Sequence, residues 1–305
     1  MRAVRRTALG IEVLDVPAPS GGVTVRVTSA GICGSDFHLI AAGPLPQTLG
    51  HEFGGLLPDG TAVAVRPNVT CGTCVACTTG RAHLCDAALG RFHGVSIDGG
   101  LADEVAVDPG CLVSLPATVD PSDAALAEPV AVAVHGVRRA GIRAGQRVLV
   151  VGAGPIGLCA IAAALDAGAD VDVEARHAPR LDAAARLGAG PARPGGYDIV
   201  VDAAGTTDSA ALAVDRVVAG GCVAMLGTWW DAATLDGRWQ LKEVTLTPAF
   251  LYGHAEFASA VGLLGAVPAL REVMVTHRFA LDDAAEAFRV ASDRTRGAIK
   301  VLLHP

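Results

Sequence analysis

The sequence predicts an α/β protein with two domains, one made of short antiparallel strands and one doubly wound around a parallel sheet. The chain has 305 residues, enough for two hydrophobic cores because domains commonly span about 100 to 200 residues. Apolar and polar side chains alternate near the N-terminus, as in residues 23–27, which is typical of half-buried strands. In the middle of the chain a β-branched run, a glycine-rich turn and an apolar helix follow one another. This succession is typical of a parallel sheet with crossover helices.

Charge and composition argue against several classes of partner. The formal net charge is −7 and the Lys and Arg residues are scattered, so neither nucleic acid nor an anionic membrane is expected. Hydrophobic residues make up 51% of the chain, but no apolar run reaches the roughly 18 to 20 residues of a membrane span. The basic start, with Arg2, Arg5 and Arg6, is not followed by the apolar segment of a signal peptide. We therefore expect a cytoplasmic protein with reduced cysteines.

The stretch from Gly31 to Glu52 combines side chains that suit a zinc ion. Cys33 offers a thiolate and His51 an imidazole, and flanking glycines let the backbone turn closely around an ion. A catalytic zinc needs a third protein ligand and one open position, and the candidates for the third ligand are Glu52 and Glu128. Packing and turn formation are the alternative roles for Cys33 and His51.

Ser35 and His38 follow Cys33 at spacings that place them beside such a metal. A bound alcohol could pass its proton to the Ser35 hydroxyl and from there to the His38 imidazole, which would form a relay to solvent. The sequence therefore predicts as catalytic residues Cys33, Ser35, His38, His51 and Glu52.

Four of the eight cysteines follow the spacing C-x2-C-x2-C-x7-C, at Cys71, Cys74, Cys77 and Cys85. Gaps of two residues let successive thiolates converge on one tetrahedral ion, and four sulfur ligands leave no open position. The pattern therefore predicts a closed, structural zinc site. A disulfide pair or an iron–sulfur cluster is the alternative, because ferredoxin-type clusters use comparable gaps.

Residues 147–167 carry the second functional motif. A β-branched strand over residues 147–151 leads into a glycine-rich turn, and an apolar helix follows over residues 158–167. This context makes the G-x-G-x-x-G turn a dinucleotide-binding fingerprint, with the cofactor pyrophosphate at the helix N-terminus. A packing turn is the alternative. The residues predicted to hold the cofactor here are Gly152, Gly154, Pro155, Ile156 and Gly157.

The string from Gly31 to His38, the Gly50-His51-Glu52 triplet, the four-cysteine motif and the glycine-rich turn together resemble the zinc-containing medium-chain dehydrogenases. This is the alcohol and sorbitol dehydrogenase family, and the resemblance runs nearly end to end. It implies a GroES-like β-barrel catalytic domain formed by residues 1–129 and 256–305. It also implies a doubly wound Rossmann domain formed by residues 130–255.

The activity that the resemblance implies is that of a zinc-dependent, NAD(P)-dependent alcohol dehydrogenase. Zinc would act as a Lewis acid and the nicotinamide would accept the hydride. In the sorbitol dehydrogenase branch a glutamate before proline lies at the metal, as Glu128 would here, which favours a secondary alcohol, polyol or sugar-like substrate. In this family the four-cysteine lobe supports subunit contacts, which implies a homodimer or homotetramer. A quinone or enoyl reductase without catalytic zinc and a non-catalytic NADPH-binding protein are the alternatives.

The end of the next strand, over residues 171–174, bears on the choice between NADP and NAD. Family members that prefer NAD carry an acidic residue there to hold the ribose 2′-hydroxyl, and the family spacing assigns that position to Ala175. Arg176 and His177 follow where a 2′-phosphate would lie, which favours NADP. Glu174 is one residue early, and a register shift of one would restore NAD.

Two further cofactor contacts are expected. Residues 204–206 and 226–228 end two later strands, and ligands of parallel sheets bind beyond such ends, so Thr228 is expected on the nicotinamide side. Lys300 falls where the family places a cation near the pyrophosphate and near Glu52. A solvated lysine at a strand end is the alternative.

Two pairs of aromatic residues are candidates for the substrate cleft. Phe92 and His93 resemble cleft residues of the family, with ordinary packing as an equal alternative. Trp229 and Trp230 follow a strand end and are candidates for the substrate mouth, while a subunit interface or surface cover is the alternative.

Overall fold

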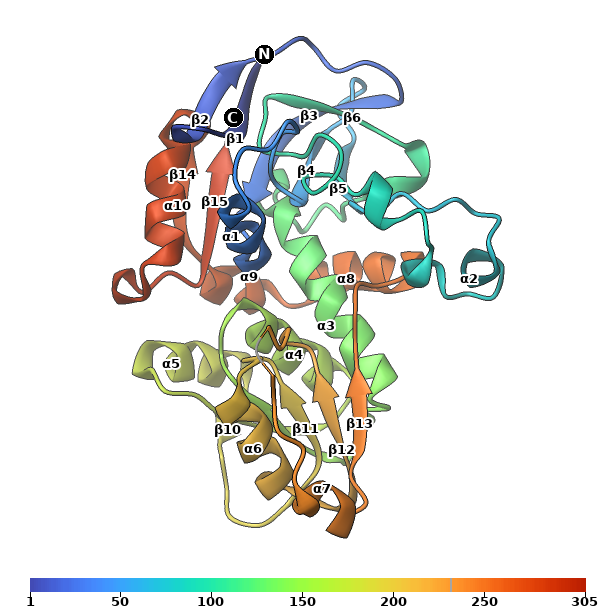
Figure 1. Cartoon of the computed structure of the whole chain (residues 1–305), viewed down its shortest axis with the longest axis vertical. Helices are drawn as coiled ribbons and strands as arrows, with labels where there is room; N and C mark the ends of the chain where they lie inside the picture. The colour runs from blue at the N-terminus through green and yellow to red at the C-terminus, as the bar shows by residue number, and fades with distance from the viewer. Residues whose placement is uncertain (231) are drawn as a thin grey trace. The chain divides into compact units, whose positions relative to one another are not determined.

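The computed structural model describes residues 1–230 and 232–305. Contacts divide these residues into two compact units. Figure 1 shows the chain coloured by residue number. Unit 1 consists of Met1–Glu128, Gly253–Ala266 and Val275–Pro305. Unit 2 consists of Pro129–Tyr252 and Val267–Met274.

Unit 1 is built on a seven-stranded, mostly antiparallel sheet with the order β14-β15-β3-β4-β5-β7, in which β6 also pairs with β3. A separate hairpin joins β1 to β2. The alternation predicted at residues 23–27 is confirmed, because Val25 and Val27 are buried and Arg26 is exposed. The strands are β1 (Arg2–Thr7), β2 (Gly10–Asp15), β3 (Val23–Gly31), β4 (Glu52–Leu56), β5 (Ala62–Val65), β6 (Glu104–Val107), β7 (Leu112–Ser114), β14 (Val275–Ala280) and β15 (Lys300–His304).

Short helices join and cover these strands, and one hydrophobic core fills the space between them. Phe53, Leu49 and Leu101 are among the largest fully buried side chains of this core. The α-helices are α1 (Gly34–Ala41), α2 (Val75–Thr78), α8 (His254–Ala266), α10 (Ala284–Ser292) and the start of α3 (Ala127–Arg139). The 3-10 helices are η1 (Ala82–Leu84), η2 (Leu89–Arg91), η3 (Pro109–Cys111), η4 (Pro121–Leu126), η5 (Leu281–Asp283) and η6 (Arg294–Arg296).

Unit 2 contains a six-stranded sheet with the order β10-β9-β8-β11-β12-β13, and every pair in it is parallel. The first strand of the unit, β8, lies in the middle of this order. The chain therefore winds outward from β8 in both directions, and ligands bind at such a switch point. The strands are β8 (Arg147–Val151), β9 (Asp170–Glu174), β10 (Gly190–Pro191), β11 (Tyr197–Asp202), β12 (Val217–Met225) and β13 (Thr245–Pro248).

Several helices of unit 2 pack against this sheet (Figure 1). Helix α4 contacts β8 and β9, and α6 contacts β8, β11 and β12. The predicted helix over residues 158–167 begins earlier, at Pro155, because proline suits the first helical position. The helices are the rest of α3, α4 (Pro155–Asp166), α5 (Ala178–Leu187), α6 (Thr207–Arg216), α7 (Gly237–Leu241) and α9 (Pro268–Met274).

Helix α9 differs from the predicted domain assignment, which placed residues 256–305 together. It packs on α4 and α5 and therefore groups with unit 2. The Met274 sulfur lies 3.3 Å from the Cys159 thiol, and Glu272 forms an ion pair of 3.0 Å with Arg186. Apolar spacing predicts that a helix is buried but does not identify the core that buries it.

No single helix among the described residues is long and apolar enough to cross a membrane. Within the described ranges, α8 and α9 reach that length and composition when they are taken together.

A buried carboxylate, Asp172 of β9, ties the short segment after α5 to the sheet of unit 2. Its Oδ2 accepts hydrogen bonds from Arg193 Nε at 2.8 Å and from the Tyr197 hydroxyl at 2.7 Å. The guanidinium groups of Arg147 and Arg216 lie 4.8 and 5.5 Å from the centre of the Tyr197 ring. Burial raises the pKa of Asp172, but the bonds from Arg193 and Tyr197 outweigh burial, so its pKa is lowered.

We predict that Asp172→Asn lowers the free energy of unfolding by about 1 to 3 kcal/mol at neutral pH, because a buried charge-assisted bond is lost. A lowered native pKa stabilises the fold above the ordinary carboxyl pKa of about 3.9, and this stabilisation is lost as pH falls through the native value. The difference between variant and wild type should therefore shrink in acid. Asp170→Asn is the control, because Asp170 pairs with the same arginine but is half-exposed. Urea unfolding at several pH values measures these free energies. An equal loss in both variants at every pH would contradict this account.

Candidate active site

The pairing of β3 with β4 brings the predicted metal ligands together. Gly31, the last residue of β3, pairs with Glu52, the first residue of β4. Cys33 therefore follows one strand end while His51 precedes the neighbouring strand. A Cβ atom at residue 31 would overlap Oε2 of Glu52, so the buried carboxylate requires glycine there.

Cys33, His51 and Glu52 form a compact donor group. One donor atom from each lies within 4.8 Å of the other two. His51 and Glu52 are buried and Cys33 is half-buried. A thiolate, an imidazole and a carboxylate fit a catalytic zinc with one open position. Glu128, the other candidate for the third ligand, is also buried but does not belong to this group.

Asp36 supports His51, a role that the sequence analysis did not assign. The Asp36 side chain is fully buried, and its Oδ1 lies 3.2 Å from Nδ1 of His51, an ion-pair distance without hydrogen-bond alignment. Its Oδ2 accepts a hydrogen bond of 2.9 Å from the Cys33 backbone N–H. A carboxylate at Nδ1 leaves Nε2 for a metal, as in many metal sites. The sequence signal for this role was an acidic residue three positions after a predicted ligand, in the first turn of a helix.

Lys300 of β15 holds the other carboxylate. Its buried ammonium donates to both carboxylate oxygens of Glu52 at 2.7 Å and to the Ile32 carbonyl at 3.1 Å. Burial opposes the charged form, but Glu52 and Cys33 outweigh it and raise the pKa of Lys300. Three acceptors use all three N–H donors. Lys300 therefore lies near Glu52, as the family resemblance implied, and its contact with the cofactor pyrophosphate stays a prediction.

The anions around His51 favour a cation at this place. Burial lowers the pKa of His51, but the negative charges of Asp36 and Cys33 outweigh burial and raise it well above its ordinary value. A divalent ion on Nε2 would satisfy the same anions. The donor set and its electrostatics therefore both fit zinc.

The relay residues lie on α1. Oγ of Ser35 is 3.3 Å from Nε2 of His51, the nitrogen that Asp36 leaves for a metal. His38 follows one turn later and is exposed. Ser35 therefore lies inside the site and His38 on the solvent side of the same helix.

The four-cysteine motif forms a second donor group. The sulfur atoms of Cys71, Cys74, Cys77 and Cys85 all lie within 4.8 Å of one another, and no disulfide joins these described residues. Backbone N–H groups of Thr73 and Cys74 lower the pKa of Cys71 to about 6. Burial and neighbouring thiols raise the pKa of Cys77 to about 12. Four thiolates this close need a cation to share, and a tetrahedral zinc ion fits that need.

The glycine-rich turn after β8 is tight on one side and open on the other. A Cβ atom at Gly157 would overlap the Gly152 carbonyl oxygen, so helix and turn pack as closely as glycine allows. A Cβ atom at Gly154 would meet only Arg180 Nη1, at 3.8 Å. Pro155 and Ile156 begin α4, whose N-terminal N–H groups suit a phosphate. This cradle fits a dinucleotide pyrophosphate.

The loops after β11 and β12 meet at the same edge of the sheet. A Cβ atom at Gly205 would come within 2.6 Å of the Thr228 carbonyl oxygen. The Trp229 indole N–H donates to buried Asp202 at 2.7 Å, and Trp230 is exposed. Trp229 therefore anchors the loop that carries Thr228.

The strand β9 ends at Glu174, and Ala175, Arg176 and His177 follow it before α5. The Glu174 carboxylate pairs with Arg216 at 3.2 Å. The Arg176 guanidinium pairs with Asp208 at 3.0 Å, and both of these side chains are exposed. Two cation–carboxylate pairs thus lie next to the predicted ribose position.

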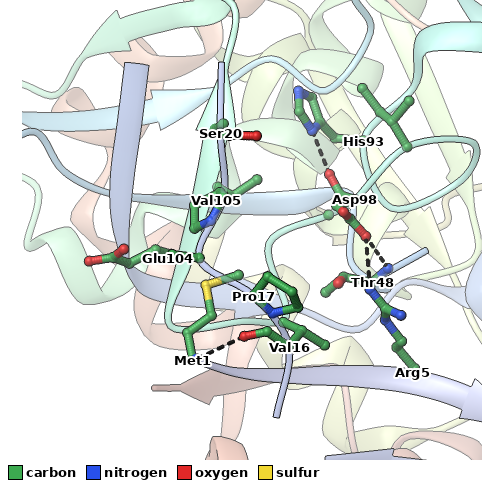
Figure 2. A pocket seen from close by; sticks show the side chains of 15 residues that line it. Met1, Arg5, Val16, Pro17, Ser20, Thr48, His93, Asp98, Glu104 and Val105 are labelled. Carbon is green, nitrogen blue, oxygen red and sulfur yellow. Dashed lines mark hydrogen bonds and ion pairs between the residues drawn. The ribbon is translucent and has the colours of Figure 1, made fainter. Parts of the chain in front are cut away.

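The two predicted cleft residues face different surroundings. The Phe92 ring lies 6.1 Å from the His51 ring, beside the donor group. His93 lines a cavity of about 440 Å³ in unit 1, shown in Figure 2. There His93 Nδ1 donates to the Asp98 carbonyl at 2.6 Å, and the Asp98 carboxylate accepts from the Thr48 N–H at 2.7 Å. No predicted metal ligand is among the residues that line this cavity.

Comparison with known proteins gives a consistent family. The family described as alcohol dehydrogenase GroES-like domain matches residues 19–117. L-arabinitol 4-dehydrogenase of Aureobasidium melanogenum is 34% identical, over 92% of this chain and 86% of the relative. L-galactonate-5-dehydrogenase of Escherichia coli is 32% identical, over 94% of this chain and 93% of the relative.

A solved structure agrees with these relatives. A protein from Sinorhizobium meliloti, assigned as a zinc-binding dehydrogenase and bound to NADP, superposes with a TM-score of 0.90 at 30% identity. The match covers 100% of this chain and 99% of that one. The family match and this superposition together confirm the predicted fold class, a GroES-like barrel domain plus a Rossmann domain. The chain therefore belongs to the zinc-containing medium-chain alcohol and sorbitol dehydrogenase family, whose members are oxidoreductases acting on CH–OH groups.

Proposed function

We propose that this chain is a zinc-dependent dehydrogenase that transfers a hydride between a secondary alcohol, polyol or sugar-like substrate and NADP(H), with NAD(H) as the weaker cofactor. The observation that carries the proposal is the buried group of Cys33, His51 and Glu52, because thiolate, imidazole and carboxylate together suit a catalytic zinc. Relatives named for arabinitol and galactonate support a polyhydroxylated substrate.

When bound, zinc supplies a Lewis acid and NADP a hydride acceptor. Cys33, His51 and either Glu52 or Glu128 would hold the catalytic ion, and Asp36 orients the His51 ring through Nδ1. Lys300 holds the Glu52 carboxylate through both oxygens.

The proton of the substrate hydroxyl would leave through Ser35. Its hydroxyl lies beside His51 in the donor group and is half-buried. His38 is exposed one turn further along α1, where it can release a proton to water.

The four-cysteine lobe would hold a structural zinc ion and support a homodimer or homotetramer in the cytoplasm. Exposed apolar side chains on and near the lobe, Val75, Leu84 and Leu89, support a subunit contact there.

Purified protein should contain two zinc ions per chain. Cys33→Ser should lose one ion and all turnover while keeping the fold, because the catalytic site lies apart from the lobe. Cys71→Ser should lose the other ion and destabilise the protein or its assembly. Elemental analysis counts the zinc ions, circular dichroism reports whether the fold is kept, and a turnover assay measures activity. Substantial activity in Cys33→Ser would mean that the catalytic site is misplaced.

Ser35→Ala should lower kcat by about 10² to 10⁴-fold, the usual range for a positioned proton-transfer group. His38→Gln should have a smaller effect, because water can replace the outer member of the relay. Steady-state kinetics across pH, on zinc-loaded variants, measure both. A wild-type pH profile in His38→Gln would remove His38 from the relay.

The wild-type enzyme should prefer NADP over NAD by about ten- to a hundredfold in kcat/KM. Charge-assisted hydrogen bonds from Arg176 to the 2′-phosphate contribute about 1.5 to 3 kcal/mol, and about 1.4 kcal/mol corresponds to a factor of ten. Replacing Ala175 by Asp together with Arg176→Gln should reverse the preference. A higher kcat/KM for NAD in the wild type would show that Glu174 binds the ribose instead.

A screen of polyols and simple alcohols tests the substrate class. Polyols with internal hydroxyls should be oxidised faster than primary alcohols of the same length. Activity on quinones or enoyl compounds, unaffected by zinc removal, would favour the reductase alternative.

A further inference from the structure

The Glu174 carboxylate lies next to the predicted position of the cofactor ribose. Its backbone carbonyl accepts the Gly152 N–H at 2.9 Å, so it lies directly beside the start of the glycine-rich turn. A free carboxylate at such a strand end can accept a ribose hydroxyl and repels a 2′-phosphate. The preference for NADP therefore depends on where this carboxylate points.

The structure directs the Glu174 carboxylate onto the face of the sheet. Side chains alternate along a strand, so Glu174 shares a face with Asp172, which is bound to Arg193 and Tyr197. Arg216, the last residue of α6, reaches this face. Its Nη1 lies 3.2 Å from Oε2 of Glu174, and its Nη2 donates to the Arg193 carbonyl at 3.0 Å.

Arg216 is held in place by more than this ion pair. Its guanidinium also stacks 5.5 Å from the centre of the Tyr197 ring, and the side chains of Arg216 and Glu174 are 26% and 37% exposed. The neighbouring pair, Arg176 with Asp208, has exposures of 76% and 81%. Exposed pairs contribute little, so Arg176 can exchange Asp208 for a phosphate while Arg216 keeps Glu174.

We propose that Arg216 is a specificity-determining positioning residue, which favours NADP by holding the Glu174 carboxylate on the sheet face, away from the 2′-phosphate. This inference rests on the proposed function, in that the glycine-rich turn must bind a nicotinamide dinucleotide. Arg216 acts through Glu174 and has no contact with the cofactor in this account.

The test measures binding of NADPH and NADH separately, by fluorescence titration of zinc-loaded protein without substrate. Arg216→Gln should raise the Kd for NADPH about fivefold, the effect of one extra charge near a surface, which corresponds to about 1 kcal/mol. The Kd for NADH should stay constant or fall. The double variant Glu174→Gln with Arg216→Gln should return the ratio of the two Kd values to within about twofold of the wild type.

Arg147→Gln is the matched control, because Arg147 stacks on the same Tyr197 ring but does not contact Glu174. It should leave the ratio unchanged. Glu174→Asp provides a second route should Arg216→Gln fail to fold: the shorter side chain withdraws the carboxylate from Arg216 and should also weaken NADPH selectively. An unchanged ratio in these variants, or a changed one that the double variant does not restore, would overturn the inference alone. A wild-type protein that binds neither dinucleotide would overturn the proposed function as well.

Discussion

The antiparallel register of β3 and β4 is the constraint on which the candidate active site depends. Pairing of Gly31 with Glu52 brings Cys33 and His51 to one end of the sheet, although 17 residues separate them in the sequence. The same register buries the Glu52 carboxylate, which then needs Lys300 as a partner. A shift of one residue would turn these side chains to the other face of the sheet.

Carboxylates with fixed partners recur through both units. In unit 1 Asp36 faces His51 and Glu52 faces Lys300, so both of these carboxylates have a defined orientation. In unit 2 Asp172, Asp202 and Glu174 are held by Arg193, Trp229 and Arg216. Removing polar groups from water wholly or in part is costly unless they are paired, so each pair restricts the segment that carries it.

The parts of the site that are local in sequence were predictable. The cysteine spacing anticipated the cluster at residues 71–85, and the strand, glycine turn and helix at residues 147–167 anticipated the centre of the parallel sheet. No local pattern encodes the contacts between distant residues. Lys300 reaches Glu52 across 248 positions, and only the family resemblance placed it there. Arg216 reaches Glu174 across 42 positions, a contact that the sequence analysis did not anticipate. Helix α9 was assigned to the other domain for the same reason, since its apolar positions would suit either core.

The central claim is that the donor group at the ends of β3 and β4 holds a zinc ion. X-ray diffraction from crystals of the protein as purified, recorded on both sides of the zinc absorption edge, tests it most directly. The account predicts two anomalous peaks, one among the four cysteine sulfurs and one within bonding distance of Cys33 Sγ and His51 Nε2. The second peak would also show whether Glu52 or Glu128 completes the ligand set. Anomalous density at the four cysteines alone, in protein that turns over alcohols, would contradict the account.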